Sequence, residues 1–241
     1  MYPIEIRHEP TEIAEQQAYN TIYAVQGIDQ RDSFYLWFLD RVVRYGRGRL
    51  LDVSCGEGSF IRFARRAGFA TIGIDFSAVA LQKAQRRVPG TVLALANAQQ
   101  LPFADNSFDV VTNIGSLEHY FDPAKGVREM ARVLRPSGVA LVLLPNAFGL
   151  FGNITHVLRH GEVYDDGQPL QRYATRASWE RLLQYNGLIP DRVIGYEREA
   201  PRTLDDLRWF LRRPSKIARL LLSRFVPVNL GNMLIFVCHK A

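Results

Sequence analysis

The sequence predicts one α/β domain over residues 1–241, with a seven-stranded, mostly parallel sheet, helices on both faces and a helical cap formed by insertions. From residue 50 onward, short apolar runs alternate with amphipathic helical stretches, a pattern typical of βαβ units. A glycine-rich turn follows the first of these runs, where such sheets place ligand-binding loops. With 241 residues, 47% of them hydrophobic, the chain can bury a substantial core without disulfides or metals.

Each element of the first half has its own signal. Residues 1–46 form an N-terminal helical segment, because apolar and aromatic side chains recur through 10–45. Ser77 can cap the helix that follows it, and Pro136-Ser137-Gly138 predicts a turn before the fifth strand. The first five strands are expected at residues 50–53, 70–74, 92–95, 108–112 and 139–144, and helices at 59–67, 78–87 and 123–134.

The last third of the chain completes the sheet and adds the cap. Thr175 can cap a further helix, which Gly187 can end in a left-handed conformation. Residues 188–196 and 233–237 are the sixth and seventh strands. Segments 147–174 and 200–230 exceed a minimal layout, and we expect these insertions to form a substrate cap.

The composition and the absence of long apolar runs indicate the compartment in which the protein is expected. The only two cysteines, Cys55 and Cys238, lie far apart in sequence and predict no disulfide framework, which favours a reducing compartment. We find no signal peptide and no apolar run near the roughly 20 residues that a membrane span needs. A cytoplasmic protein is expected, with peripheral membrane contact left open.

The turn after residue 53 is the most informative stretch. Gly56 and Gly58 stand between a buried strand and a helix, and they let the backbone approach a ligand closely. Asp75 ends the next strand, about 20 residues after the loop, where a ribose-binding carboxylate belongs. Two alternatives remain: a strand-turn-helix corner without a ligand, and a dinucleotide site. The third glycine of a dinucleotide motif falls on Ile61, which disfavours an NAD enzyme.

In these segments the chain resembles the class I S-adenosylmethionine-dependent methyltransferases, in particular the small-molecule branch that contains quinone, sugar and natural-product enzymes. Residues 51–58 are similar to the first motif of that family, 73–77 to its ribose motif, and 97–111 to its adenine-side loop and fourth strand. The resemblance continues through residues 117–119, 122–123 and 129–138. It covers about residues 47–146, the cofactor-binding core, plus the two terminal strands.

The resemblance implies a Rossmann-like fold, S-adenosyl-L-methionine as cofactor and a set of binding residues. The glycine turn would line the methionine portion of the cofactor, the carboxylate after the second strand would hold the ribose, and the loop after the third strand would meet the adenine. The implied cofactor-binding residues are Asp52, Ser54, Gly56, Gly58, Asp75, Phe76, Asn97, Ala98, Gln99, Asn113, Ile114 and Gly115.

Two residues depart from the family pattern. Ser54 replaces the usual first glycine of the turn, and we expect it to adopt an ordinary negative φ. Asn97 stands where an aspartate is common, and its amide can still form hydrogen bonds near the adenine. Neither change removes a group that the chemistry needs.

His119 is the candidate catalytic base, since it follows the fourth strand at the ligand edge and its ordinary pKa is near neutrality. A structural histidine at a helix start is the alternative. Glu118 is expected to orient backbone or a neighbour. No metal site is predicted, because the histidines are scattered and no paired-cysteine spacing occurs. The first insertion supplies further residues that could contact an acceptor: His156, His160, Tyr164, Asp165, Asp166 and Tyr173.

The second insertion carries most of the chain's net charge of +6. Residues 200–226 hold seven basic and two acidic residues, interleaved with leucines and aromatics, and Pro214 should divide them into two helices. Three interpretations stay open: a solvated basic face above an ordinary cap, contact with a membrane or a lipid-linked substrate, and contact with nucleic acid.

These observations together predict a methyltransferase that acts on a small-molecule, sugar or lipid-linked acceptor, with O-methylation favoured. The alternatives are C-methylation of a quinone-like ring and a non-catalytic protein that binds S-adenosylmethionine. Residues 112–116 lack the Asn/Asp-Pro-Pro-aromatic pattern of many DNA- and protein-methylating relatives, which makes a nucleic-acid partner unlikely.

Overall fold

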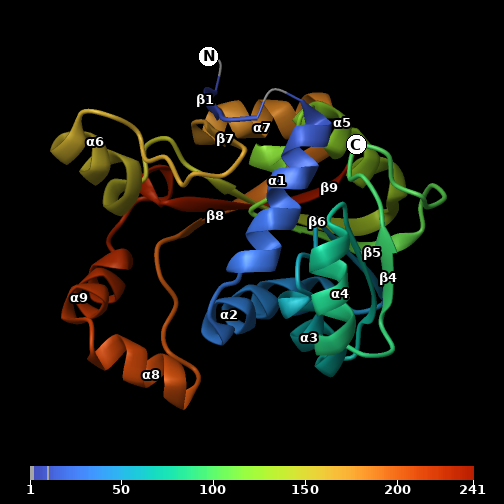
Figure 1. Cartoon of the computed structure of the whole chain (residues 1–241), viewed down its shortest axis with the longest axis horizontal. Coiled ribbons are helices and arrows are strands. Elements are labelled where there is room, and N and C mark those ends of the chain that lie inside the picture. The colour runs from blue at the N-terminus through green and yellow to red at the C-terminus, as the bar shows by residue number, and fades with distance from the viewer. Residues whose placement is uncertain (1–2, 10) are drawn as a thin grey trace.

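The computed structural model, which describes residues 3–9 and 11–241, contains the predicted seven-stranded sheet (Figure 1). Five parallel strands are neighbours in space, and the last strand of the chain runs antiparallel between the fifth of these and the one remaining strand, which forms the edge of the sheet. In spatial order the strands are β4 (Val92–Leu95), β3 (Ala70–Asp75), β2 (Arg49–Val53), β5 (Phe108–Ile114), β6 (Leu134–Pro145), β9 (Met233–Lys240) and β8 (Leu188–Tyr196). The predicted fold class is therefore confirmed.

Helices cover both faces of this sheet, since successive side chains of its central strands point to opposite faces and both sets are apolar. Leu50 packs in one core cluster and its neighbour Leu51 in the other, and Val110 and Val111 divide in the same way. Helices α2 (Asp32–Val42) and α3 (Ser59–Arg66) contribute to the first cluster; α5 (Pro123–Val133) and α7 (Arg176–Tyr185) contribute to the second.

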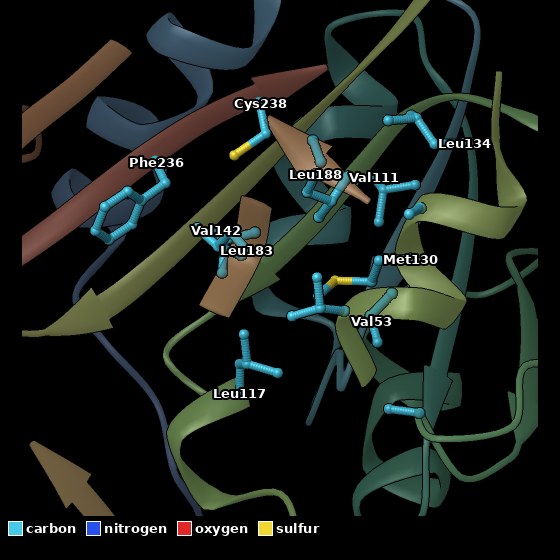
Figure 2. Close-up of a cluster of buried hydrophobic side chains, with 14 of the residues drawn as sticks. Val53, Val111, Leu117, Met130, Leu134, Val142, Leu183, Leu188, Phe236 and Cys238 are labelled. Atoms are coloured by element: carbon cyan, nitrogen blue, oxygen red, sulfur yellow. The ribbon is translucent and has the colours of Figure 1, made fainter. Parts of the chain in front are cut away.

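Figure 2 shows the second cluster, in which Met130 of α5 and Leu183 of α7 meet side chains of the sheet. Val142 and Phe236, from neighbouring antiparallel strands, pack in the same cluster. All four side chains are fully buried. Burying each such side chain contributes about 1.5–3 kcal/mol to the free energy of unfolding, so this layer stabilises the arrangement of the strands.

Helix α1 (Glu12–Val25) takes a different place. It packs against α4 (Ala78–Arg87) through Tyr19, Tyr23 and Ala80, which form a small cluster of their own. Short 3-10 helices, Val43–Tyr45, Leu117–His119 and Val228–Leu230, connect other elements. The predicted cap of α4 is confirmed, because the Ser77 hydroxyl accepts from the backbone N–H of Ala80 at 3.2 Å.

Two details differ from the sequence expectation. Strand β6 begins at Leu134, so Pro136-Ser137-Gly138 lies inside the strand rather than in a turn before it. Phe108 pairs with Leu134 and Val110 with Val139, so residues 135–138 bulge out of register opposite a single residue. A bulge accommodates the proline and glycine without ending the strand.

The second difference is a separate two-stranded ribbon. Strand β1 (Ile4–Arg7) pairs antiparallel with β7 (Leu170–Tyr173), which lies in the first insertion. Glu5 stands opposite Arg172 and forms an ion pair with it at 2.8 Å. Two four-residue strands separated by most of the chain give no local sequence signal, which explains why the ribbon was not predicted.

The insertions form a helical cap, which projects to the left in Figure 1. The first contains a π-helical turn (Leu150–Ile154) and α6 (Thr155–His160). The second contains α8 (Leu204–Leu211) and α9 (Pro214–Ser223), so Pro214 divides the basic segment as predicted. In the part of the chain that the structure describes, no helix is long and apolar enough to cross a membrane.

Candidate active site

A cavity of about 490 Å³ lies at the carboxyl ends of the central strands, within the range of about 300–1,000 Å³ typical of small-molecule sites. Asp52, Asp75 and Ile114 reach it from the strands β2, β3 and β5. Tyr19 and Tyr23 line it from α1, and the insertions contribute its far wall. The topology thus produces the site, because all these strand ends meet at one edge.

The turn after β2 takes an unusual path. Gly56 has a φ of 52°, and a Cβ there would lie 2.9 Å from the Tyr23 hydroxyl oxygen, so any other residue would be strained and crowded at this position. Ser54 has a φ of 61°, and the expectation of an ordinary negative φ was wrong. The turn demands the left-handed conformation at this position, whichever residue occupies it. The Ser54 hydroxyl lines the cavity and shares a 2.8 Å hydrogen bond with the Tyr120 hydroxyl.

Asp75 holds this turn in place. Its two carboxylate oxygens accept from the backbone N–H groups of Gly56 and Ser77, both at 2.9 Å. Each oxygen keeps a second lone pair, so two hydroxyl donors can still be accepted. Burial raises the pKa of Asp75 to about 6, while these backbone hydrogen bonds oppose the shift. Asp52 is also buried, with its pKa raised to about 7, and accepts from the Thr112 hydroxyl at 2.7 Å.

On the adenine side that the resemblance implies, two predicted side chains are bound by α1. Asn97 and Gln99 both donate to the Glu12 carboxylate, the second at 2.7 Å. Gln16 donates to the backbone carbonyl of Phe76 at 2.6 Å. These hydrogen bonds hold helix α1 across this part of the cavity. Phe76, Asn97, Ala98 and Gln99 all line it, as do Ile114 and Gly115.

Two of the predicted binding residues do not line the cavity. Gly58 is the N-cap residue of α3, and a Cβ there would lie 3.1 Å from the Val88 side chain, so this glycine permits close packing of α3 on α4. Asn113 is fully buried. It donates to the Tyr120 hydroxyl at 2.7 Å and accepts from the backbone N–H of Leu117 at 3.0 Å. Both residues therefore support the turn and the loop that line the site.

His119 lines the cavity and is buried. Its Nδ1 bonds to the backbone carbonyl of Leu170, which can only accept, so Nδ1 carries the proton. In the neutral ring Nε2 then keeps a free lone pair. Burial lowers the pKa of His119 below its ordinary value of 6.5, which keeps the ring neutral at pH 7. Nε2 of the neutral ring can therefore accept a proton.

The sequence did not predict the environment of Glu118, a residue of the cavity wall. Glu118 lines the cavity, is fully buried, and one of its carboxylate oxygens has no hydrogen-bond partner among the described residues. Burial raises its pKa to about 8. Gln171, Arg198 and Asn232 line the same cavity, and each also carries a buried polar atom without a partner in the described chain. Such groups point to a bound ligand or water.

The six residues of the first insertion that the sequence suggested as acceptor contacts fall into two groups. Tyr164, Asp166 and Tyr173 line the cavity. The other three residues suggested from the sequence do not: Asp165 pairs with His8 at 3.0 Å, and the rings of His156 and His160 pack on each other with centroids 4.4 Å apart.

The cavity suits S-adenosylmethionine on its own chemistry. The cofactor carries a sulfonium and an ammonium group, and the wall near the strand ends carries Asp52, Asp75 and Glu118. Glu12 and Glu15 of α1 line the same end. A cation bound here would favour the ionised forms of these buried carboxylates, whose pKa values are raised in its absence.

The doubly wound sheet and this cavity define a nucleotide-type ligand site at the switch point of an α/β protein. Comparison with known proteins narrows the class, because residues 51–142 match the pattern of a methyltransferase domain. Over these residues the chain is similar to S-adenosylmethionine-dependent methyltransferases. This similarity supports the predicted family, enzyme class and cofactor.

The relatives are similar over part of their length. A probable S-adenosylmethionine-dependent methyltransferase of Mycobacterium tuberculosis is 33% identical over 144 residues, which cover 57% of this chain and 53% of the relative. A demethylmenaquinone methyltransferase of Renibacterium salmoninarum is 39% identical over 94 residues, 39% of this chain and 40% of the relative. The chain spans about half the length of the first curated relatives it matches.

Solved structures support the fold. An S-adenosylmethionine-dependent methyltransferase from Mesorhizobium loti superposes with a TM-score of 0.61 at 18% identity, covering 86% of this chain and 98% of that one. The [4+2]-cyclase SpnF gives a TM-score of 0.64 at 20% identity, covering 96% and 97%. Since one of these neighbours is a cyclase, the fold alone does not specify the reaction.

Proposed function

We propose that this protein transfers the methyl group of S-adenosylmethionine to a hydroxyl group of a small-molecule, sugar or lipid-linked acceptor. The observation that carries the proposal is His119, whose Nδ1 is bound to the Leu170 carbonyl and whose Nε2 keeps its lone pair beside the cavity. A hydroxyl acceptor must lose a proton during transfer, and a neutral imidazole can accept it. S-adenosylmethionine supplies an activated methyl group when bound.

The other residues of the site bind and orient in this proposal. Asp75 would accept from the ribose hydroxyls with the lone pairs that Gly56 and Ser77 leave free. Asp52 and Glu118 would face the positive charge of the cofactor. The adenine would meet Phe76, Asn97, Ala98 and Gln99 under α1, and the glycine turn with Ser54, Ile114 and Gly115 would line the methionine side. Holding acceptor and donor close and aligned supplies much of the rate acceleration.

The test is replacement of His119 by asparagine, which keeps a donor near the position of Nδ1 and removes Nε2. We expect methyl transfer to fall by roughly 10²–10⁴-fold, while S-adenosylhomocysteine binds about as well as before. In the unaltered protein the rate should fall as the pH drops through the lowered pKa of His119, and be flat above about pH 7. Transfer is measured with labelled S-adenosylmethionine and an extract separated into organic, aqueous and macromolecular fractions. An asparagine variant with the normal rate would exclude His119 as the base.

C-methylation of a quinone-like ring is the second candidate. It is favoured by the relatives named demethylmenaquinone methyltransferase and ubiquinone/menaquinone biosynthesis C-methyltransferase, the latter 32% identical over 127 residues. The atom that receives a ¹³C-labelled methyl group separates the two candidates, because methyl carbons bonded to oxygen and to carbon have different NMR shifts. A third candidate, a non-catalytic cofactor-binding protein, predicts binding of S-adenosylmethionine without label in any fraction.

We further propose peripheral contact of the cap with a membrane, as a route for a lipid-linked acceptor. Leu204, Leu207 and Leu211 recur at helical spacing along α8, and all three are exposed. Arg208 and Arg212 are exposed in the same segment. An apolar stripe flanked by arginines is typical of helices that lie in the interface of anionic membranes. The two buried free thiols, Cys55 and Cys238, favour a reducing compartment, and we place the protein in the cytoplasm.

A further inference from the structure

The end of the cavity beneath the cap is basic. Arg198, which follows β8, and Arg219 of α9 both line the cavity. Arg213, at the start of α9, and Arg198 lie against the same indole ring of Trp209, with guanidinium carbons 4.6 and 5.7 Å from its centroid. Arg213 and Lys216 do not line the cavity themselves, but Lys216 of α9 lies close enough to the three arginines to feel their charge. We call these four residues the cap cations: Arg198, Arg213, Lys216 and Arg219.

Most of this positive charge is uncompensated. Arg219 has an ion pair with Glu197 at 2.9 Å. Over residues 3–9 and 11–241, no carboxylate lies within ion-pair distance of Arg198, Arg213 or Lys216. The pKa of Lys216 is lowered by burial and by the neighbouring Arg198, Arg219 and Arg213, so these cations repel one another. Holding like charges together costs free energy unless an anion binds between them.

Arg198 also has a hydrogen-bond donor without an acceptor among the described residues. Its Nε is buried, and no acceptor bonds to it within the described chain. A guanidinium presents its donors in a rigid, planar fork that matches the oxygens of a phosphate. The residue itself lines the cavity.

The two ends of the cavity have opposite charge. Carboxylates of Asp52, Asp75 and Glu118 lie near the strand ends, whereas Arg198 and Arg219 lie at the cap, where Glu197 offsets the charge of Arg219. The acidic end suits the sulfonium and ammonium groups of the cofactor. The basic end then remains for the other reactant, and its charge selects an anion.

We propose that Arg198, with Lys216 and Arg213, binds a phosphate or diphosphate group of the methyl acceptor. The proposal rests on the proposed function, since it names the substrate class of the same site. The phosphate would anchor the acceptor at the cap and leave its hydroxyl near His119. An acceptor of this class is either a soluble phosphorylated molecule or a lipid with a phosphate headgroup.

The test uses the full-length protein saturated with S-adenosylhomocysteine and titrated with inorganic pyrophosphate in a calorimeter. Two variants, Arg198→Gln and Lys216→Gln, each remove one positive charge from the site. Arg212→Gln is the matched control, because it removes the same charge from an exposed position of the same segment. We expect tenfold or greater loss of pyrophosphate affinity in Arg198→Gln, a smaller loss in Lys216→Gln, and no change in the control.

Two outcomes would overturn the proposal. One is pyrophosphate affinity that is unchanged in Arg198→Gln. The other is parallel loss of S-adenosylhomocysteine affinity, which would assign the cap cations to the carboxylate of the cofactor. Pyrophosphate binding can be measured whether or not the protein transfers methyl groups. If binding depends on Arg198 but no methyl transfer is found, the proposed function is refuted and the anion site is still supported.

A competition experiment separates the two sources of phosphate. Vesicles of phosphatidylglycerol that displace pyrophosphate, where phosphatidylcholine vesicles do not, would identify an anionic lipid headgroup. Displacement by soluble sugar phosphates alone would identify a soluble acceptor. In both cases Arg198→Gln should weaken direct binding of the competitor itself, and undiminished binding in that variant would contradict the site.

Discussion

Single residues shape the part of the cavity at the strand ends, and Ser54 is the clearest case. Its left-handed conformation, with a φ of 61°, costs about 1–2 kcal/mol for a residue other than glycine. The hydrogen bond to Tyr120 offsets part of this cost, and Tyr120 also accepts from Asn113. A serine in place of glycine thus links the turn after β2 to the loop after β5, a link that a glycine could not make.

Asp75 yields a prediction at the same scale. In Asp75→Asn one carboxylate oxygen becomes an amide NH₂ that faces a backbone N–H of Gly56 or Ser77. We expect the affinity for S-adenosylhomocysteine to fall by tenfold or more, because the turn loosens and an acceptor for the ribose is lost. Equilibrium titration measures this change. Asp191→Asn, at an exposed residue paired with His239, is the control and should bind normally. Equal affinity in Asp75→Asn and the control would refute the ribose role.

Elements outside the sheet complete the site. Helix α1 covers the cavity through contacts that local sequence patterns do not predict. Glu12 accepts from the side chains of Asn97 and Gln99, and Gln16 donates to the Phe76 carbonyl. The two adenine-side residues expected from the sequence do line the cavity, but their side chains hold α1. The ribbon of β1 and β7 acts in the same way, since the Leu170 carbonyl of β7 fixes the tautomer of His119.

The cap helix α8 carries a prediction about membranes. Replacing Leu207 and Leu211 together by glutamine removes two exposed apolar side chains without touching the cap cations that line the cavity. If α8 lies in the interface, this variant should lose most binding to phosphatidylglycerol vesicles in a sedimentation assay, while its affinity for pyrophosphate is kept. Tyr185→Gln, at a residue of α7 that is 80% exposed, is the control. Undiminished vesicle binding in the double variant would show that α8 is an ordinary solvated cap.

For the whole molecule, the buried carboxylates link stability to pH. Burial raises the pKa of Glu118 to about 8 and that of Asp52 to about 7, so the folded protein retains protons that the unfolded chain has lost. Stability should therefore fall as the pH rises from about 4.5 to 8, by at most about 1.4 kcal/mol per pH unit for each proton. His119 has a lowered pKa and acts in the opposite sense, with stability lost as the pH falls below 6.5. Above pH 7 the carboxylates dominate.

Urea unfolding at pH 7 and pH 8.5 tests this linkage. We expect the unaltered protein to have a lower midpoint at pH 8.5, and Glu118→Gln to lose most of that difference, because glutamine does not titrate. Glu162→Gln, at an exposed residue of the first insertion, should behave like the unaltered protein. If Glu118→Gln keeps the full difference between the two pH values, Glu118 does not hold a proton in the folded state.

The sequence by itself determined the sheet, the glycine turn, the carboxylate at the end of β3 and the division of the basic segment at Pro214. These features are local, because apolar runs, glycines, caps and prolines act on the backbone within a few residues. Only the tertiary structure decided that Gly58 and Asn113 support the site rather than line it, that Glu118 is buried with an oxygen unpaired among the described residues, and that Arg198 lies beside the cations of α9. Such properties depend on which distant segments pack together, since burial and neighbouring charge are set by the whole fold.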